Sequence, residues 1–221
     1  MRVPRKRLAR ARRRMLRRHI EGRGISDPRV LDAMAAVPRE EFVPPGLVRD
    51  AYRDGPLPIG EGQTISQPYV VATMAEAAEL KPGDRVLEVG TGSGYAAAVF
   101  SRIADVVYTI ERHASLADSA RERLRELGYG NVHVGHGDGT RGWPEHAPYD
   151  AIVVAAGGRS VPEALREQLA PGGRLLMPVG SLGAGQSLVR ERRGEGGAYT
   201  AEGLGPVRFV PLIADVPARN R

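Results

Sequence analysis

The sequence contains no cysteine, which excludes disulfide bridges, thiolate zinc sites and cysteine nucleophiles. It has no apolar run near the roughly 20 residues that a membrane-spanning helix needs. Its basic N-terminus also lacks the apolar stretch of a secretory signal peptide. The histidines are His19, His113, His133, His136 and His146, and no set of them has metal-ligand spacing. We therefore expect a cytoplasmic protein with no membrane span and no metal site.

Positive charge is concentrated in an N-terminal arm. The whole chain carries +6, but residues 1–23 alone carry +10, so the remaining 198 residues carry −4. No aromatic residue lies among these arginines, so the arm has no side chains on which bases could stack. We interpret residues 1–24 as a solvated basic arm and do not expect a nucleic-acid partner; binding to nucleic acid or to an acidic substrate is the alternative. Deleting residues 1–20 is then expected to leave activity largely intact.

The segment Val86–Tyr95 reads as a buried strand that ends in a glycine-rich turn and passes into a helix. Gly90, Gly92 and Gly94 allow a sharp turn and close approach to a ligand. This spacing differs from the G-x-G-x-x-G of dinucleotide-binding proteins. An acid, Glu88, before alternating glycines suits a cationic cofactor without phosphate, S-adenosylmethionine. The alternative is a tight strand-to-helix turn that binds nothing.

Two further strand ends carry acids at suitable places. Glu111 ends the strand 106–111, and lies 21 residues beyond Gly90, near the separation at which an acid accepts both ribose hydroxyls. Asp138 and Gly139 follow the strand 132–136, where they can reach an adenine edge. The alternatives are a surface acid for Glu111 and an Asx-turn for Asp138.

From residue 81 onward, strands and helices alternate. This alternation predicts an α/β fold with a doubly wound, mostly parallel sheet. The predicted elements are strands 86–89, 106–111, 132–136, 151–154 and 174–178, helices 115–127 and 162–169, and antiparallel edge strands 187–192 and 207–212. We expect one domain over 25–221, in which 25–80 form a helical cap and substrate-side segment and 81–221 form the cofactor-binding sheet.

The cap contains clear helix signals. Asp27 followed by Pro28 predicts a helix over 28–36. Prolines and glycines dominate 44–62, which predicts a long irregular segment. Ser66 is expected to cap a helix over 67–80.

Several tracts then resemble one family, the protein-L-isoaspartate O-methyltransferases. The tracts are AVPREEFVP (36–44), GQTISQPYVVATM (62–74), VLEVGTGSGY (86–95), HGDGTRGW (136–143), APYDAIVV (147–154), QLAPGGRLLMPVG (168–180) and VRFVPL (207–212). The resemblance covers roughly residues 25–212. The glycine motif is shared by many methyltransferases, whereas TISQP and VRFVPL in order are far more specific.

The resemblance implies a class I, Rossmann-like S-adenosylmethionine-dependent methyltransferase with an N-terminal helical cap and antiparallel C-terminal edge strands. It implies methyl transfer to the free α-carboxylate of L-isoaspartyl residues in damaged proteins or peptides. The ester closes to a succinimide, whose opening returns some normal aspartate. The family's catalytic serine falls on Ser66. The cofactor-binding residues expected from motif and resemblance together are Gln63, Thr64, Ile65, Glu88, Gly90, Thr91, Gly92, Glu111, Asp138 and Gly139. We expect a monomer.

The chemistry agrees with this assignment. A carboxylate acceptor, with an unperturbed pKa of about 3.3–3.9, is already ionised at pH 7 and needs no general base. The protein must align acceptor and methyl and exclude water. We therefore expect positioning donors, with the Ser66 hydroxyl foremost; the alternative for Ser66 is a plain N-cap.

Other functions remain open at this point. They are a carboxyl methyltransferase that modifies one dedicated precursor peptide, an RNA methyltransferase guided by the arm, and a non-catalytic cofactor-binding module. The chain lacks the Asn-Pro-Pro-Tyr tract of exocyclic-amine methylation and the cysteine of pyrimidine C5 methylation. Gly157-Gly158-Arg159 departs from the usual family pattern. We expect it to loosen its loop, place a cation near the acceptor entrance and affect acceptor preference.

Overall fold

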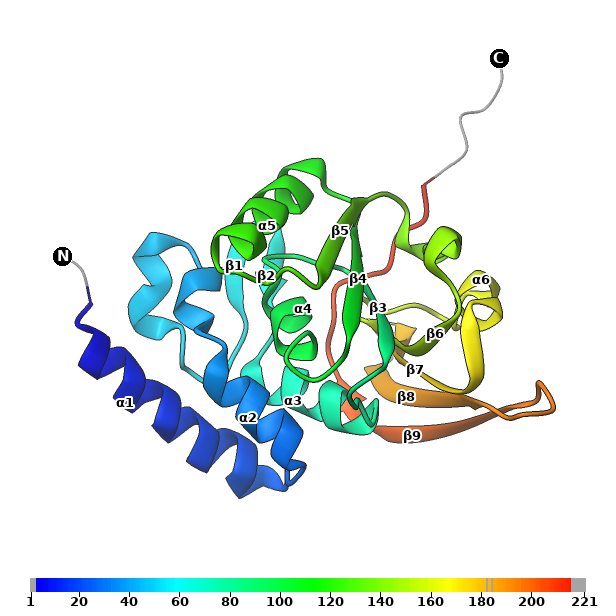
Figure 1. Ribbon diagram of the computed structural model, residues 1–221, viewed down its shortest axis with the longest axis horizontal. Coiled ribbons are helices and arrows are strands. Elements are labelled where there is room, and N and C mark those ends of the chain that lie inside the picture. Colours follow the sequence, from blue (N-terminus) through cyan, green and yellow to red (C-terminus); the bar gives the residue numbers. More distant parts are fainter. Residues whose placement is uncertain (1–2, 182, 184, 216–221) are drawn as a thin grey trace, which may run out of the picture.

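A seven-stranded sheet forms the centre of the computed structural model, which describes residues 3–181, 183 and 185–215 (Figure 1). The strand order is β5-β4-β3-β6-β7-β8-β9. The pairs from β5 to β7 are parallel, and β7–β8 and β8–β9 are antiparallel. The strands are β3 Arg85–Val89, β4 Val106–Glu111, β5 Val132–His136, β6 Tyr149–Val154, β7 Leu169–Ser181, β8 Gly185–Arg193 and β9 Tyr199–Val207. The doubly wound, mostly parallel fold is confirmed.

Apolar residues cover both faces of this sheet. In β3, Val86 packs into one hydrophobic cluster and its neighbour Leu87 into another on the opposite face. A strand buried on both faces reads as a continuous apolar run. The helices are α1 Arg5–Met15, α2 Pro28–Ala36, α3 Pro68–Ala77, α4 Tyr95–Phe100, α5 Ala114–Glu126 and α6 Glu163–Glu167. Short helical turns are η1 Leu16–Ile20, η2 Glu21–Arg23, η3 Arg39–Phe42, η4 Pro45–Asp50, η5 Gly139–Arg141 and η6 Pro144–His146.

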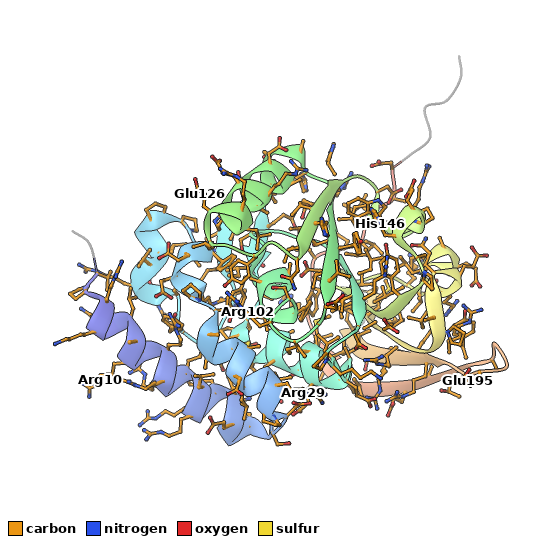
Figure 2. All side chains as sticks on the ribbon, viewed as in Figure 1. Arg10, Arg29, Arg102, Glu126, His146 and Glu195 are labelled. Carbon is orange, nitrogen blue, oxygen red and sulfur yellow. The ribbon has the colours of Figure 1, made fainter. Side chains whose placement is uncertain are left out.

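The basic arm is part of the cap rather than a free appendage. Met15 and Ile20 are fully buried in the larger hydrophobic cluster. Arg12 reaches across to the cap, where its Nε donates to the Tyr52 hydroxyl at 2.7 Å and its guanidinium pairs with Glu40 at 3.2 Å. The solvated face of α1 is the one turned away from the cap. Figure 2 shows Arg10 projecting from this face, away from the rest of the molecule. The interpretation of a wholly solvated arm is therefore wrong, and deleting residues 1–20 would expose core surface of the cap; its effect on activity stays a prediction.

Two predictions for the cap also change. The segment 44–62 is not irregular, because it contains η4 and the strand β1 Leu57–Gly60, which forms an antiparallel pair with β2 Gln63–Ile65. The helix α3 begins at Pro68 with Gln67 as its N-cap residue, and the Gln67 side chain makes no capping hydrogen bond. Ser66 is thus not the helix cap. The Asp27 cap is confirmed, since its carboxylate accepts from the Arg29 N–H at 2.8 Å.

The last edge strand lies earlier than predicted. β9 ends at Val207, because it forms a hairpin with β8 around the turn at 194–197. Residues 208–215 leave the sheet and run back toward the carboxyl ends of the parallel strands (Figure 1). In the described part of the chain, every helix is too short or too polar to traverse a bilayer.

Candidate active site

The glycine-rich turn joins β3 to α4 at the carboxyl end of the sheet. Gly90, Gly92 and Gly94 all have positive φ, at +98°, +53° and +87°, a region that favours glycine. A Cβ on Gly92 would lie 3.1 Å from Cδ1 of Ile59 in β1. The cap therefore closes over the turn, and a side chain at this position would fill the space between them.

Glu111 is held at the tip of β4 by backbone donors. Its Oε2 accepts from the Gly92 N–H at 2.9 Å, and its Oε1 accepts from the His113 N–H at 3.0 Å. The side chain is buried, yet it faces the cavity described below. Two backbone N–H groups fix a carboxylate in one orientation, which prepares it to accept further donors from a ligand.

Glu88 forms a buried chain of hydrogen bonds below the turn. The parallel register places it opposite Thr109, whose hydroxyl donates to Glu88 Oε2 at 2.5 Å. Thr91 Oγ1 lies 2.7 Å from Thr109 Oγ1, and its hydroxyl donates there because the Thr109 hydrogen is already used. Burial raises the pKa of Glu88 to about 8, and the negative charge of Glu111 adds to this increase. Glu88 is thus connected through Thr109 to Thr91 and holds the glycine-rich turn in place.

These strand ends surround a cavity of about 280 Å³, close to the lower end of the ~300–1,000 Å³ typical of small-molecule sites. All the predicted site residues except Asp138 line it: Gln63, Thr64, Ile65, Ser66, Glu88, Gly90, Thr91, Gly92, Glu111 and Gly139. Ser93, which the sequence analysis did not select, also lines the cavity. Its hydroxyl is buried and has no hydrogen-bond partner among the described residues. Ser93 is thus a polar residue of the cavity lining whose hydroxyl the described residues leave unsatisfied.

Asp138 has a different environment from its neighbours. Its Oδ1 accepts from the N–H and the hydroxyl of Thr140 at 2.9 and 2.7 Å. Its Oδ2 accepts from the N–H of Asp215 at 3.0 Å. These bonds hold the pKa of the Asp138 carboxyl below its usual range, against the opposing effect of burial. The structure thus shows Asp138 as a turn residue that fastens the C-terminal segment beside the cavity, and the adenine contact stays a prediction.

The C-terminal segment forms a cavity wall that sequence reasoning missed. Val210, Pro211, Leu212 and Ile213 all line the cavity. The segment is attached through Gly157, whose N–H donates to the Val210 carbonyl at 2.8 Å and whose carbonyl accepts from the Leu212 N–H at 2.7 Å. Only the VRFVPL resemblance points to this wall, and the residues of that tract by themselves predict an edge strand.

The Gly157-Gly158-Arg159 departure does not loosen its loop. A Cβ on Gly157 would lie 2.1 Å from Nε2 of Gln186, and one on Gly158 would lie 2.6 Å from Cε of Met177. The glycines therefore permit close packing. Arg159 is exposed and lines neither this cavity nor the groove described next, and its effect on acceptor preference stays a prediction.

A wider groove of about 1,020 Å³ adjoins the cavity. It runs between α3 and the segment after β9, and Tyr69, Val70 and Phe209 are among its lining residues. The cavity and the groove share Thr64, Ser66, Ala155, Val210 and Pro211. Ser66 therefore lies where a small ligand in the cavity and a larger ligand in the groove would meet.

The Ser66 hydroxyl is free to serve a ligand. It is partly exposed, and in the described part of the chain it has no hydrogen-bond partner. Its backbone carbonyl, by contrast, accepts from Nη1 of Arg39 at 2.7 Å. Arg39 is a second residue that sequence reasoning missed, because a buried arginine has no pattern that separates it from surface arginines.

Comparison with known proteins agrees with this geometry. A family model described as Protein-L-isoaspartate(D-aspartate) O-methyltransferase (PCMT) matches residues 10–216. The protein-L-isoaspartate O-methyltransferase 1 of Geotalea uraniireducens is 61% identical over 208 residues, which are 94% of this chain and 95% of the relative. The protein-L-isoaspartate O-methyltransferase of Methylorubrum extorquens is 57% identical over 94% of this chain and 90% of its own length.

Solved structures show the same likeness. One protein-L-isoaspartate O-methyltransferase superimposes with a TM-score of 0.80 at 33% identity. That match covers 90% of this chain and 65% of the other. A Plasmodium falciparum protein named for the same activity, solved in complex with S-adenosyl-L-homocysteine, gives a TM-score of 0.78 at 27% identity. That match covers 90% of this chain and 97% of the other.

Proposed function

Because the chain belongs to the protein-L-isoaspartate (D-aspartate) O-methyltransferase family, we propose that it methylates the free α-carboxylate of L-isoaspartyl residues in damaged proteins and peptides. The methyl donor is S-adenosyl-L-methionine. The methyl ester then closes to a succinimide, which begins repair. The observation that carries this proposal is the junction of a small cavity and a larger groove at Ser66.

The cavity fits the donor in its chemistry. The Glu111 carboxylate is oriented to accept from the ribose hydroxyls, and Gly90 and Gly92 leave room for the ligand against the backbone. The unpaired Ser93 hydroxyl supplies a further polar contact. Gln63, Thr64 and Ile65 cover the opening from the β1–β2 hairpin. When bound, the donor supplies a methyl group activated by an adjacent sulfonium.

The protein's own part in the reaction is positioning. The Ser66 hydroxyl donates to one oxygen of the acceptor carboxylate and leaves the other oxygen to attack. Apolar groups at the junction, Ala155 and Val210, exclude water from that oxygen. No general base is required, because the carboxylate is ionised at neutral pH.

Some sequence predictions remain untested. They are the monomeric state, the cytoplasmic location and the lack of a nucleic-acid partner. A dedicated precursor peptide as the acceptor is also untested, and no contact among the residues that the structure describes favours it over isoaspartyl proteins.

An assay with methyl-labelled S-adenosyl-L-methionine tests the proposal. An isoaspartyl peptide is compared with its normal aspartyl twin, at equal concentration. We expect base-labile label on the isoaspartyl peptide alone. Equal labelling of both, or label that resists base, would reject this substrate and reaction class.

A further inference from the structure

Arg39 is a fully buried cation, with no exposed surface. It lies in η3 and donates to three backbone carbonyls. Nε donates to the Ala51 oxygen at 2.7 Å, Nη1 to the Ser66 oxygen at 2.7 Å and Nη2 to the Gly55 oxygen at 3.3 Å. Among the described residues no carboxylate pairs with it, so its charge is balanced by carbonyl dipoles and by the ring of Tyr95.

Burial without a counter-ion is costly for a guanidinium. Burial accordingly lowers the pKa of the Arg39 guanidinium below its ordinary value. An apolar side chain would fill the same space without this desolvation cost. The reason for an arginine here is therefore the geometry that its hydrogen bonds to the backbone impose. The planar fork of donors fixes several carbonyls at once, which a single ammonium cannot do.

The carbonyls that Arg39 binds come from two segments of the cap. Ala51 and Gly55 flank the turn between η4 and β1, and Ser66 links β2 to α3. The guanidinium carbon also lies 5.0 Å from the ring centroid of Tyr95. Tyr95 is the first residue of α4, directly after the glycine turn. One side chain thus connects the cap, the Ser66 backbone and the helix that begins at the cofactor cavity.

Nothing else described fixes Ser66 in this way. Its hydroxyl caps no helix, and Gln67, not Ser66, is the N-cap residue of α3. The Ser66 carbonyl is held by Arg39 alone. We propose that Arg39 is a positioning residue, which sets the Ser66 hydroxyl at the junction of cavity and groove for methyl transfer. This inference rests on the proposed function.

A double-mutant cycle between Arg39 and Ser66 tests it. Arg39→Lys keeps the charge but loses the fork, and we expect kcat on an isoaspartyl peptide to fall about 10-fold while S-adenosylhomocysteine affinity changes less than about 2-fold. In a Ser66→Ala background the same change should lower kcat by less than about 2-fold, because residues that act through one another are not additive. Equal falls of about 10-fold in both backgrounds would overturn the proposal.

Arg174→Lys is the matched control. Arg174 is also buried, and it donates to the carbonyls of Ala78, Glu79 and Asp150 away from the junction, besides pairing with Asp84. We expect it to lower the melting temperature without a selective loss of kcat. If both variants lose kcat in proportion to their melting temperatures, Arg39 has a structural role only and the proposal fails.

Hydrogen exchange supplies a readout that does not depend on activity. The amides of residues 64–67, 69 and 70 should exchange faster in Arg39→Lys than in the wild type, and at the wild-type rate in Arg174→Lys; Pro68 has no amide hydrogen. Unchanged exchange over this segment would reject the positioning role, whether or not the peptide is a substrate. A peptide that is not methylated would count against the proposed function and not against the positioning role. If Arg39→Lys does not fold, Arg39→Gln is carried through both measurements, because its amide nitrogen reaches only the position of Nε and so can replace the bond to Ala51 but not the bond to Ser66.

Discussion

The N–H of Gly92 donates to Oε2 of Glu111 at 2.9 Å. This bond joins the glycine-rich turn after β3 to the tip of β4, two segments separated by a helix in the sequence. The turn and the carboxylate thus keep a fixed relation before any ligand binds. Such preorganisation lowers the cost of ordering the site on binding.

We expect Glu111→Gln to weaken S-adenosylhomocysteine binding by about 10- to 100-fold. The amide has lost the charge, and a hydrogen bond to a charged group contributes ~1.5–3 kcal/mol. Isothermal titration calorimetry measures the change. Glu126→Gln, on the outer face of α5 (Figure 2), is the control and should bind as the wild type does. Wild-type affinity in Glu111→Gln would show that the carboxylate does not contact the cofactor.

Ser66→Ala should lower turnover of an isoaspartyl peptide by about 10- to 100-fold, the range of one lost charge-assisted hydrogen bond. Binding of S-adenosylhomocysteine should stay within about 2-fold, since Ser66 donates to the acceptor. Steady-state kinetics and calorimetry on the same preparation separate the two effects. Ser119→Ala, on exposed α5 surface, is the control. Unchanged turnover would remove Ser66 from the reaction.

Glu88 makes stability depend on pH in a specific direction. Folded Glu88 keeps its proton up to a pKa of about 8, whereas its ordinary value is 4.5. Between these values the folded protein binds more protons than the unfolded chain, so the free energy of unfolding falls as pH rises, by up to about 1.4 kcal/mol per pH unit.

Glu88→Gln removes this titration, and we expect it to flatten that fall. Urea unfolding at pH 5, 6.5 and 8 gives the slopes, and the difference between variant and wild type isolates Glu88 from other groups. Parallel slopes in the two proteins would mean that Glu88 is already ionised in the folded state.

The buried arm residues lead to a stability prediction. Met15→Ala and Ile20→Ala should each lower the free energy of unfolding by about 2–5 kcal/mol, as expected for large core side chains. Arg10→Ala, on the solvated face, should change it by less than about 0.5 kcal/mol. Chemical denaturation compares all three. A small effect of the core changes would restore the interpretation of a separable arm.

The sequence predicted the sheet well because its strands carry strong local signals. Val86–Val89, which is apolar apart from Glu88, and 151–154 are runs bounded by turns, and the glycines that follow Val89 turn the chain sharply. Glu111 could be placed because parallel strands end at one edge of the sheet.

Predictions failed where tertiary contacts decide the structure. Leu8, Met15 and Ile20 have helical spacing, but only the cap shows that this stripe is buried rather than solvated. The tract 207–212 has the residues of a strand, yet its bonds to Gly157 place it along the cavity. The role of Arg39 depends on three carbonyls at distant sequence positions, which no local pattern records.

The central claim is that the strand tips hold the methyl donor with its reactive sulfur toward Ser66. A crystal structure of this chain with S-adenosylhomocysteine tests it most directly. We predict density in the cavity beside Gly90 and Gly92, with ribose hydroxyls on Glu111 and the sulfur facing the groove at Ser66. Density elsewhere, or a sulfur turned away from Ser66, would contradict the account.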